Sequence, residues 1–369
     1  MTLISVISII EKYKENNYQK ELGTIKNTYS ITIFMFLMLI VLSIQSIFIG
    51  VIDISVADIF AGNFHEINIL LISRLPRLLA ILCTGVGMSI AGLIMQQLCM
   101  NKFVSPTTGA TISSAQLGVL VCMIIAPGAG ILTKTSIAFV TSILGTWSFV
   151  FFAQKMKLKD AIMMPLIGIM FGNVIGGITT YFSYKYGLMQ SLNATFVGDF
   201  SLIIRGRYEI VFLVVPLIII AYIYANQFNI VGMGENFAKN LGINPNVVMF
   251  GGLSIVALIT ASIVVTVGTI SYLGLIVPNL VALFRGDKIR GSMLDISIFG
   301  ALFTLVCDIL GRVLIAPYEL PIDLIIGILG SVLFIGLMFK KLSPAKKIKV
   351  KQSKKIETIN VMKSGEANA

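Results

Sequence analysis

Charged residues are scarce in this chain of 369 residues, because Asp, Glu, Lys and Arg together make up only 12% of it. A soluble domain typically carries about 25% charged residues. Hydrophobic residues account for 56%, and the mean hydropathy is +0.93. These values exclude an ordinary water-soluble enzyme. They predict an all-α polytopic membrane protein, because each crossing needs about 20 apolar residues and the chain has room for about ten.

The residue types that carry most metal and nucleophilic chemistry are also rare. The only histidine is His65, and the cysteines Cys83, Cys99, Cys122 and Cys307 lie in apolar runs without CxxC spacing, as packed thiols do. No HExxH, GxSxG or GxxxxGK[ST] motif occurs, so neither a hydrolase site nor a nucleotide site is indicated. We expect no catalytic residue, no metal site and no cofactor. Energy for any transport must therefore come from outside this chain.

Ten apolar stretches account for most of the chain. They lie at about 30–50, 75–98, 106–126, 132–154, 161–185, 208–226, 247–267, 270–284, 293–312 and 321–339. Their lengths predict helices, since no backbone group can stay unpaired in lipid. The eighth is expected to be a broken or partial crossing, because Gly274 and Pro278 interrupt it. The chain thus divides into an N-terminal segment (1–29), a transmembrane domain (30–340) and a basic tail (341–369).

The net charge of +11 could indicate nucleic-acid binding, but the basic residues segregate by side of the membrane. With ten crossings and a cytoplasmic N-terminus, 21 of the 28 Lys and Arg fall inside and seven outside, as the positive-inside rule requires. Nineteen of the 21 inside residues are Lys, which is expected next to anionic lipid. Five of the seven outside residues are Arg, the residue that pairs best with carboxylates at an interface. This excludes nucleic acid as a partner. It predicts that both termini are cytoplasmic and that the outer face binds a protein.

Two charged motifs lie at the outer ends of predicted helices. Arg74-Leu75-Pro76-Arg77 opens the second stretch, and Pro76 fits the first turn of a helix. These arginines either anchor the helix end at the membrane interface or dock a partner. Asp308 and Arg312 are four residues apart, so they can face each other across one turn. An internal ion pair and an outward role for Arg312 both remain open.

One cytoplasmic loop contains a short amphipathic segment, in which Phe237 and Leu241 are four residues apart and Ala238 and Leu241 are three apart. A helix this short cannot cross the membrane, so its apolar face needs either the membrane surface or the groove of a partner. The partner is favoured because glycines bound the segment. The segment comprises Gly234, Glu235, Asn236, Phe237, Ala238, Lys239, Asn240, Leu241 and Gly242.

Small and polar residues mark two further places. Gly168, Gly172 and Gly176 recur every four residues in the fifth stretch, a spacing that lets membrane helices approach closely. They pack either within one subunit or beside a moving gate or subunit interface. The polar junction 96–109 either lines a cavity or caps two helix ends, and the residue types favour capping.

From about residue 30 to 340, the chain resembles the FecCD-type iron-siderophore and cobalamin ABC import permeases. The motifs that carry the resemblance occur in the same order as in that family. They are Arg74-Leu75-Pro76-Arg77, the Gln-rich junction running to Asn101 and Ser105-Pro106, the 234–243 loop, Gly274-Leu275-Ile276-Val277-Pro278, Asp308 with Arg312, and Glu319-Leu320-Pro321.

The resemblance implies a type II ABC importer permease with ten transmembrane helices, in the bacterial cytoplasmic membrane. Its partners would be cytoplasmic ATPase subunits, an extracytoplasmic substrate-binding protein, a second permease subunit and membrane lipid. By the same resemblance, Arg74, Arg77 and Arg312 pair with glutamates of the binding protein, and segment 234–242 is the coupling helix that enters an ATPase groove.

Two residues depart from the family pattern, and the first of them bears on the expected cargo. Asn279 follows Pro278 where the family commonly has His, and Asp323 stands where the family has Gly. The Asn279 variant resembles the subgroup that imports ferric catecholate siderophores such as petrobactin or enterobactin. A cobalamin or haem permease of the same family is the alternative. An ion-coupled secondary transporter and an intramembrane enzyme are less favoured, because charged or catalytic constellations at membrane depth are missing.

Overall fold

The computed structural model describes residues 29–50, 64–155, 163–206, 208–285, 289–337 and 339. Within these ranges all regular elements are helical. In chain order they are the helix Tyr29–Phe48, α3 (Phe64–Ile69), the π-helical turn η1 (Leu70–Arg74), α4 (Leu75–Leu98), the 3₁₀ turn η2 (Pro106–Gly109), α5 (Thr111–Ile125), α6 (Ile131–Lys155), α7 (Met163–Lys185), α8 (Met189–Phe196), the 3₁₀ turn η3 (Glu209–Leu213), α9 (Val214–Gly232), α10 (Glu235–Asn240), α11 (Pro245–Val267), α12 (Leu273–Arg285), α13 (Ile289–Val313) and the helix Ile322–Leu337.

The ten predicted apolar stretches all form helices. Seven helical segments of the described chain are long and apolar enough to cross a membrane, namely Tyr29–Phe48, Glu66–Leu98, Ile131–Lys155, Met163–Lys185, Glu209–Gly232, Pro245–Val267 and Gly291–Val313. The other three stretches form shorter apolar helices, Thr111–Ile125, Leu273–Leu283 and Ile322–Leu337. The all-α polytopic class is therefore confirmed. Residues 1–28 and 341–369, which include nearly all of the predicted terminal segments, lie outside the described residues.

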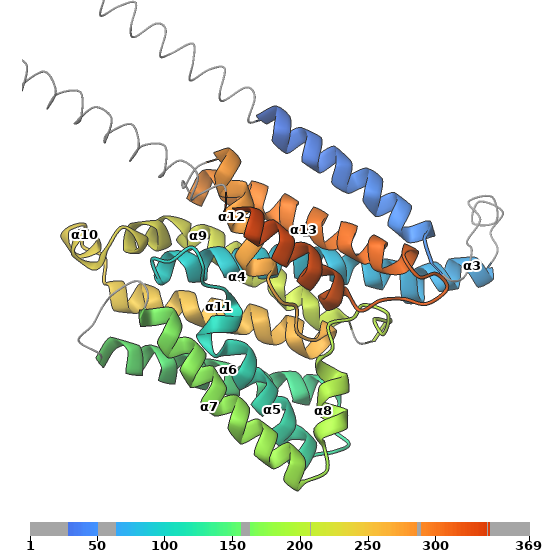
Figure 1. Cartoon of the computed structure of the whole chain (residues 1–369), viewed down its shortest axis with the longest axis horizontal. Coiled ribbons are helices and arrows are strands. Elements are labelled where there is room, and N and C mark those ends of the chain that lie inside the picture. Colours follow the sequence, from blue (N-terminus) through green and yellow to red (C-terminus); the bar gives the residue numbers. More distant parts are fainter. Residues whose placement is uncertain are drawn as a thin grey trace, which may run out of the picture.

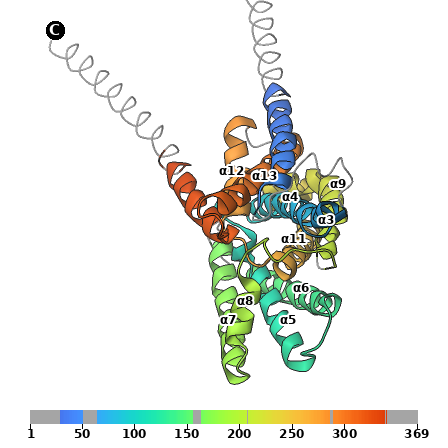
Figure 2. The ribbon, with the colours of Figure 1, turned by 90° about the vertical axis from the view of Figure 1, so that its right-hand side faces the viewer.

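The helices are arranged around α4 and α11 (Figure 1). On one side of this pair lie α12, α13 and the helix Ile322–Leu337, and on the other side lie α5, α6 and α7. Figure 2 shows that α7 and the helix Ile322–Leu337 lie on the same side of the molecule. Along the long axis, α10 lies at one end and α3 at the other. We call these the α10 end and the α3 end.

The eighth stretch is a short helix whose proline is accommodated by a neighbouring side chain. Pro278 lies inside α12, and because proline has no N–H, the carbonyl of Gly274 loses its helical donor. The side-chain amide of Gln96 in α4 donates to the carbonyl oxygens of Gly274 and Leu275, at 3.3 Å each. A Cβ at Gly92 would lie only 1.9 Å from the Gly274 oxygen. Glycine at position 92 therefore lets α4 approach α12 closely enough for Gln96 to form these hydrogen bonds.

The prediction that Pro76 sits in the first turn of a helix is confirmed for α4, which begins at Leu75. The helical backbone nevertheless continues upstream, through η1 into α3. In η1 the N–H of Leu75 donates to the carbonyl of Leu70, five residues earlier. Such π turns accommodate a break in the regular helical ladder. The second span is thereby extended to Glu66–Leu98.

The helix Tyr29–Phe48 lies at the edge of the bundle (Figure 1), and its only buried side chains are Thr32 and Ser46. These residues are about four helical turns apart, so they share one face. Thr32 donates to Asp295 of α13 at 2.6 Å, and Asp295 is also paired with Arg285. Ser46 accepts from Arg312 at 2.5 Å. Two polar contacts thus fasten the two ends of a helix whose remaining surface is largely apolar and exposed.

Candidate functional site

Five charged side chains gather at the α3 end, where α4 begins and α13 ends. We call Arg74, Arg77, Asp308, Arg312 and Glu319 the arginine cluster. Arg77 pairs with Asp308 at 2.8 Å and with Glu319 at 2.7 Å. Arg312 pairs with the other oxygen of Asp308 at 2.5 Å, and both of these side chains are only 2% exposed. Asp308 therefore binds two guanidinium groups from two helices, and the predicted contact between Asp308 and Arg312 is confirmed.

The same cluster holds the C-terminal end of the helix Tyr29–Phe48. Arg74 donates to the carbonyl of Ile49 at 2.8 Å, and Arg312 donates to the same carbonyl at 2.7 Å and to that of Ser46 at 2.9 Å. The last carbonyls of a helix have no donor within the helix and carry partial negative charge, so cations stabilise them. The three arginines predicted to dock a binding protein thus lie together and all bind groups of their own chain. Three guanidinium groups against two carboxylates give the cluster a net charge of +1.

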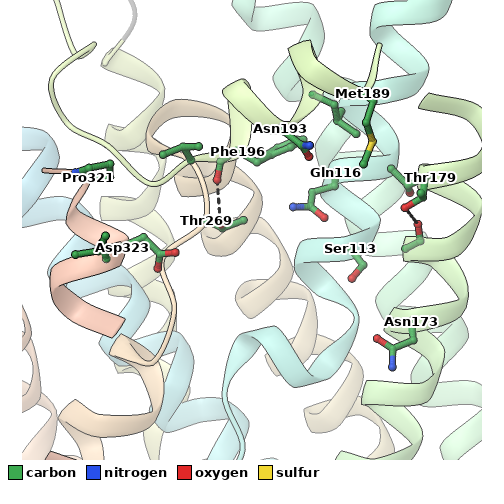
Figure 3. A pocket seen from close by; sticks show the side chains of 16 residues that line it. Ser113, Gln116, Asn173, Thr179, Met189, Asn193, Phe196, Thr269, Pro321 and Asp323 are labelled. Atoms are coloured by element: carbon green, nitrogen blue, oxygen red, sulfur yellow. Dashed lines mark hydrogen bonds between the residues drawn. The ribbon is translucent and has the colours of Figure 1, made fainter. Parts of the chain in front are cut away.

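A cavity of about 900 Å³ with a mixed polar and apolar lining lies between α5, α7, α8 and the start of the helix Ile322–Leu337 (Figure 3). Its lining residues are Ser113, Gln116, Gly172, Asn173, Gly176, Thr179, Thr180, Met189, Leu192, Asn193, Phe196, Val197, Thr269, Pro321, Asp323 and Leu324. Polar side chains on transmembrane helices are costly in lipid and usually face a cavity or a neighbouring helix. This volume is in the range of small-molecule binding sites.

Three side-chain amides line the cavity from three helices, Gln116 from α5, Asn173 from α7 and Asn193 from α8 (Figure 3). No hydrogen bond joins these amides to any described residue. The threonine hydroxyl groups differ, because most of them are satisfied by backbone carbonyls: Thr179 donates to Ile175 at 2.8 Å and Thr269 to Phe196 at 2.8 Å. Like the Ser113 hydroxyl, the three amides are therefore uncharged polar groups of the cavity wall that could bind a ligand.

The three spaced glycines of α7 lie in two different environments. A Cβ at Gly168 would lie 2.0 Å from the carbonyl oxygen of Thr108, so this glycine packs within the subunit. A Cβ at Gly172 would make an ordinary contact of 3.5 Å with Ser113, and one at Gly176 would meet nothing within 4 Å. Both Gly172 and Gly176 line the cavity. Of the three glycines, Gly168 therefore makes a packing contact, whereas Gly172 and Gly176 form part of the cavity wall.

The predicted amphipathic segment forms α10, at the end of the molecule opposite α3 (Figure 1). It ends in a Schellman motif, in which Ile243 N–H donates to the Ala238 carbonyl and Gly242 N–H to the Lys239 carbonyl, both at 3.0 Å. Gly242 has φ +75°, which favours glycine. Ala238 is buried, whereas Phe237 is 47% exposed and Leu241 is 55% exposed. The helix therefore presents an apolar pair away from its own chain.

The polar junction between α4 and α5 caps helix ends. Ser105 and Thr108 form a reciprocal capping box around η2, with Ser105 N–H donating to the Thr108 hydroxyl at 3.3 Å. Thr111 donates to the Pro106 carbonyl at 2.7 Å. The capping interpretation is thus confirmed at η2, where the third apolar stretch begins, whereas Gln96 at the other end of the junction binds carbonyls of α12. At the far side of this junction, the Asn279 amide donates to the Lys102 carbonyl at 2.7 Å, which ties α12 to the loop.

The four cysteines are free thiols, and three of them are buried. Burial raises the pKa of Cys99 to about 12, so its thiol stays protonated and unreactive. Among the described residues, no group of three or more His, Cys, Asp or Glu side chains could hold a metal ion.

Sequence reasoning missed the cavity amides Gln116, Asn173 and Asn193. Their only linear signal is that each is an isolated amide in or beside an apolar helix. A polar residue in an apolar helix is a candidate functional residue. The sequence does not show, however, that three such residues from three helices line the same cavity.

The model of the FecCD transport family matches residues 37–340. The chain belongs to the FecCD transport family. Two similar relatives in this family are the petrobactin import system permease proteins YclN of Bacillus subtilis and FatD of Bacillus anthracis. YclN is 45% identical over 84% of this chain and 98% of its own length, and FatD is 35% identical over 84% and 90%. More distant FecCD relatives include the vitamin B12 import system permease protein BtuC of Vibrio cholerae, 27% identical over 72% and 81%.

The FecCD fold is also found in a solved metal-chelate type ABC transporter in an inward-facing conformation. It superimposes with a TM-score of 0.74 at 23% identity, covering 84% of this chain and 99% of that one. The all-α architecture of an ABC importer permease is thereby confirmed for this FecCD chain. The chain is a multi-pass membrane protein of an ABC importer family, and such permeases are transport subunits, not enzymes.

Proposed function

We propose that this FecCD-family chain is the permease subunit of an ATP-driven importer that moves a ferric siderophore of the catecholate type across the bacterial cytoplasmic membrane. The observation that carries this proposal is the 45% identity to a petrobactin import permease over 98% of that protein's length. The haemin and vitamin B12 permeases among the relatives are only 26% and 27% identical, which favours a siderophore over haem or cobalamin.

The cargo path in this proposal runs through the cavity beside α7. A transport path must bind its cargo weakly enough to release it, and amide and hydroxyl groups on several helices suit that need. A second permease subunit, identical or different, would cover the cavity and the exposed face of α7. That face is rich in apolar side chains, namely Leu166, Ile169, Met170, Val174, Ile178 and Tyr181, and apolar surfaces of this kind mark subunit or lipid contacts.

In the same proposal the α10 end faces the cytoplasm, and α10 is the coupling helix that enters a groove of the ATPase subunit. Support comes from the exposed pair Phe237 and Leu241 on a helix too short to cross the membrane. It comes also from the charge count, since 21 of the 28 basic residues fall on this side when both termini are cytoplasmic.

The arginine cluster is the proposed docking site for an extracytoplasmic substrate-binding protein. Arg77 and Arg312 already bind carboxylates of their own chain. They would therefore attract the binding protein through the net positive charge of the cluster and not through new ion pairs. Arg74 donates to the carbonyl of Ile49 and adds its positive charge to the same cluster. Electrostatic complementarity of this kind acts mainly on the rate of association and depends on salt.

Arg74→Gln is therefore expected to weaken binding of the cognate binding protein about fivefold at low salt, and less at high salt, since one interfacial charge pair contributes about 1 kcal/mol. Binding to detergent-solubilised transporter would be measured by surface plasmon resonance. Lys134→Gln, which removes a positive charge at the start of α6 outside the cluster, is the matched control. Unchanged affinity of Arg74→Gln at low salt would rule out a docking role for this residue.

The importer assignment is tested by purifying the tagged chain from its native membrane in mild detergent and identifying its partners by mass spectrometry. We expect a P-loop ATPase in about equal amount, together with any second permease. A chain that purifies alone and drives uptake from an ion gradient would support the rival class, a secondary transporter. That rival needs an ion site at membrane depth, and Asp308, the acidic candidate predicted from the sequence, is held by two arginines.

A further inference from the structure

We infer that Asp323 makes the cavity selective for a metal chelate that carries a protonated amine. The inference rests on the proposed function, because it takes the cavity as the cargo path. It goes beyond that function because it names Asp323 as the residue that distinguishes one metal chelate from another.

Asp323 is the only charged residue among the sixteen that line the cavity. The other polar lining groups are neutral amides and hydroxyls. A carboxylate in a partly dehydrated wall attracts a cation more strongly than it would in water, and it repels an anion by the same physics. The charge selectivity of this part of the path therefore depends on one residue.

The geometry leaves one oxygen of Asp323 available to the cargo. Its Oδ1 accepts the backbone N–H of Ser271 at 2.7 Å, which fixes the side chain against the segment before α12. In the described part of the chain, no donor binds Oδ2. The side chain is half-buried, and it lies across the cavity from Gln116 and Asn173 (Figure 3). A cargo between these walls would meet a carboxylate on one side and amides on the other.

This arrangement matches a chelate with two kinds of surface. Amides both donate and accept hydrogen bonds, so they suit the oxygen-rich face of a metal chelate without binding it tightly. The carboxylate suits an ammonium group elsewhere on the same molecule. A single carboxylate does not make a site for a bare metal ion, which needs several oxygen ligands.

Asp323 also has a local structural role that the test must separate from selectivity. It lies in the first turn of the helix Ile322–Leu337, where negative charge is favoured by about 0.3–1 kcal/mol. Asp323→Asn is the informative variant, because the asparagine side-chain oxygen can still accept the Ser271 N–H while the charge is lost. Asp199→Asn is the matched control. Asp199 accepts the Ser201 N–H at 2.9 Å in a nearby loop and does not line the cavity.

The experiment uses the complete transporter with its ATPase and binding protein in ATP-loaded proteoliposomes. Two ferric bis-catecholate chelates are supplied on the same triamine linker, one with a free secondary amine and one with that amine acetylated. We expect the wild type to take up the amine chelate about fivefold faster than the acetylated one, which is the effect of an ion pair of about 1 kcal/mol. Asp323→Asn should lower the ratio of the two rates about fivefold, because it removes both the attraction for the ammonium group and the repulsion of the more negative acetylated chelate. Asp199→Asn should keep the wild-type ratio.

Because both transporters use the same binding protein, its own preference cancels when the two rate ratios are compared. The inference is overturned if Asp323→Asn keeps the wild-type ratio, or if it slows both chelates equally, as a purely structural role would. Failure of the proposed function gives a different result, since the wild type would then take up neither chelate with ATP, and the inference would fall with it.

Discussion

Asp308→Asn is expected to lower the free energy of unfolding more than any other single change in the arginine cluster, by about 3–5 kcal/mol. Asp308 is 2% exposed and is the shared carboxylate of Arg77 and Arg312. Its neutralisation would leave the buried guanidinium of Arg312 without an opposite charge in contact, and the single asparagine oxygen could replace only one of the two carboxylate oxygens that now serve Arg77 and Arg312. Thermal unfolding in detergent, followed by fluorescence-detected size exclusion, measures the loss.

Glu319→Gln is the matched control, because it removes the second carboxylate of Arg77 but leaves Asp308 in place. The Glu319 side chain is 19% exposed, so water can solvate the groups that lose their partner, and the expected cost is about 1 kcal/mol or less. If Asp308→Asn proved as stable as the wild type, or if Glu319→Gln cost as much, the cluster would not be organised around Asp308.

Phe237→Asp is expected to reduce both the amount of co-purified ATPase and the rate of transport at least tenfold. The change puts a carboxylate into the apolar surface that α10 presents, and burying an unpaired charge at an interface costs several kcal/mol. Folding of the permease itself should be nearly unaffected, since the Phe237 side chain is 47% exposed. Leu241→Asp, one turn further along, should give the same result.

Lys239→Gln is the control on the same helix. Its side chain is 61% exposed and pairs with Glu235 at 3.8 Å across one turn, a contact that contributes about 0.5 kcal/mol or less. We expect normal ATPase association and transport. Full transport by Phe237→Asp would remove α10 from the coupling role and point instead to another contact at the α10 end.

Much of the helical architecture could be predicted because the membrane imposes it on the linear sequence. Runs of apolar residues predicted all ten apolar helices, including the short α12, and glycines bounding an amphipathic segment predicted α10. Helix α8 was not predicted, since eight residues are too few to produce a hydropathy signal. The upstream extension of α4 was also missed, because a π turn has no signal in the hydropathy of the sequence.

The candidate sites were less accessible to sequence reasoning. The contact between Asp308 and Arg312 follows from a spacing of four residues, but Arg77 joins them across 231 positions. Nothing local to Arg77 indicates that its charge is used within the chain. The cavity also depends on residues that are far apart in the sequence. Its amides come from three helices, and packing contacts such as that of Gly168 with Thr108 set how these helices face one another.

The most direct test of the central claim is uptake of a ⁵⁵Fe-labelled ferric catecholate siderophore by proteoliposomes that contain this permease, its ATPase and its binding protein. The account predicts uptake that requires internal ATP and the binding protein and that persists when ionophores collapse all ion gradients. Uptake driven by an ion gradient without ATP would contradict it.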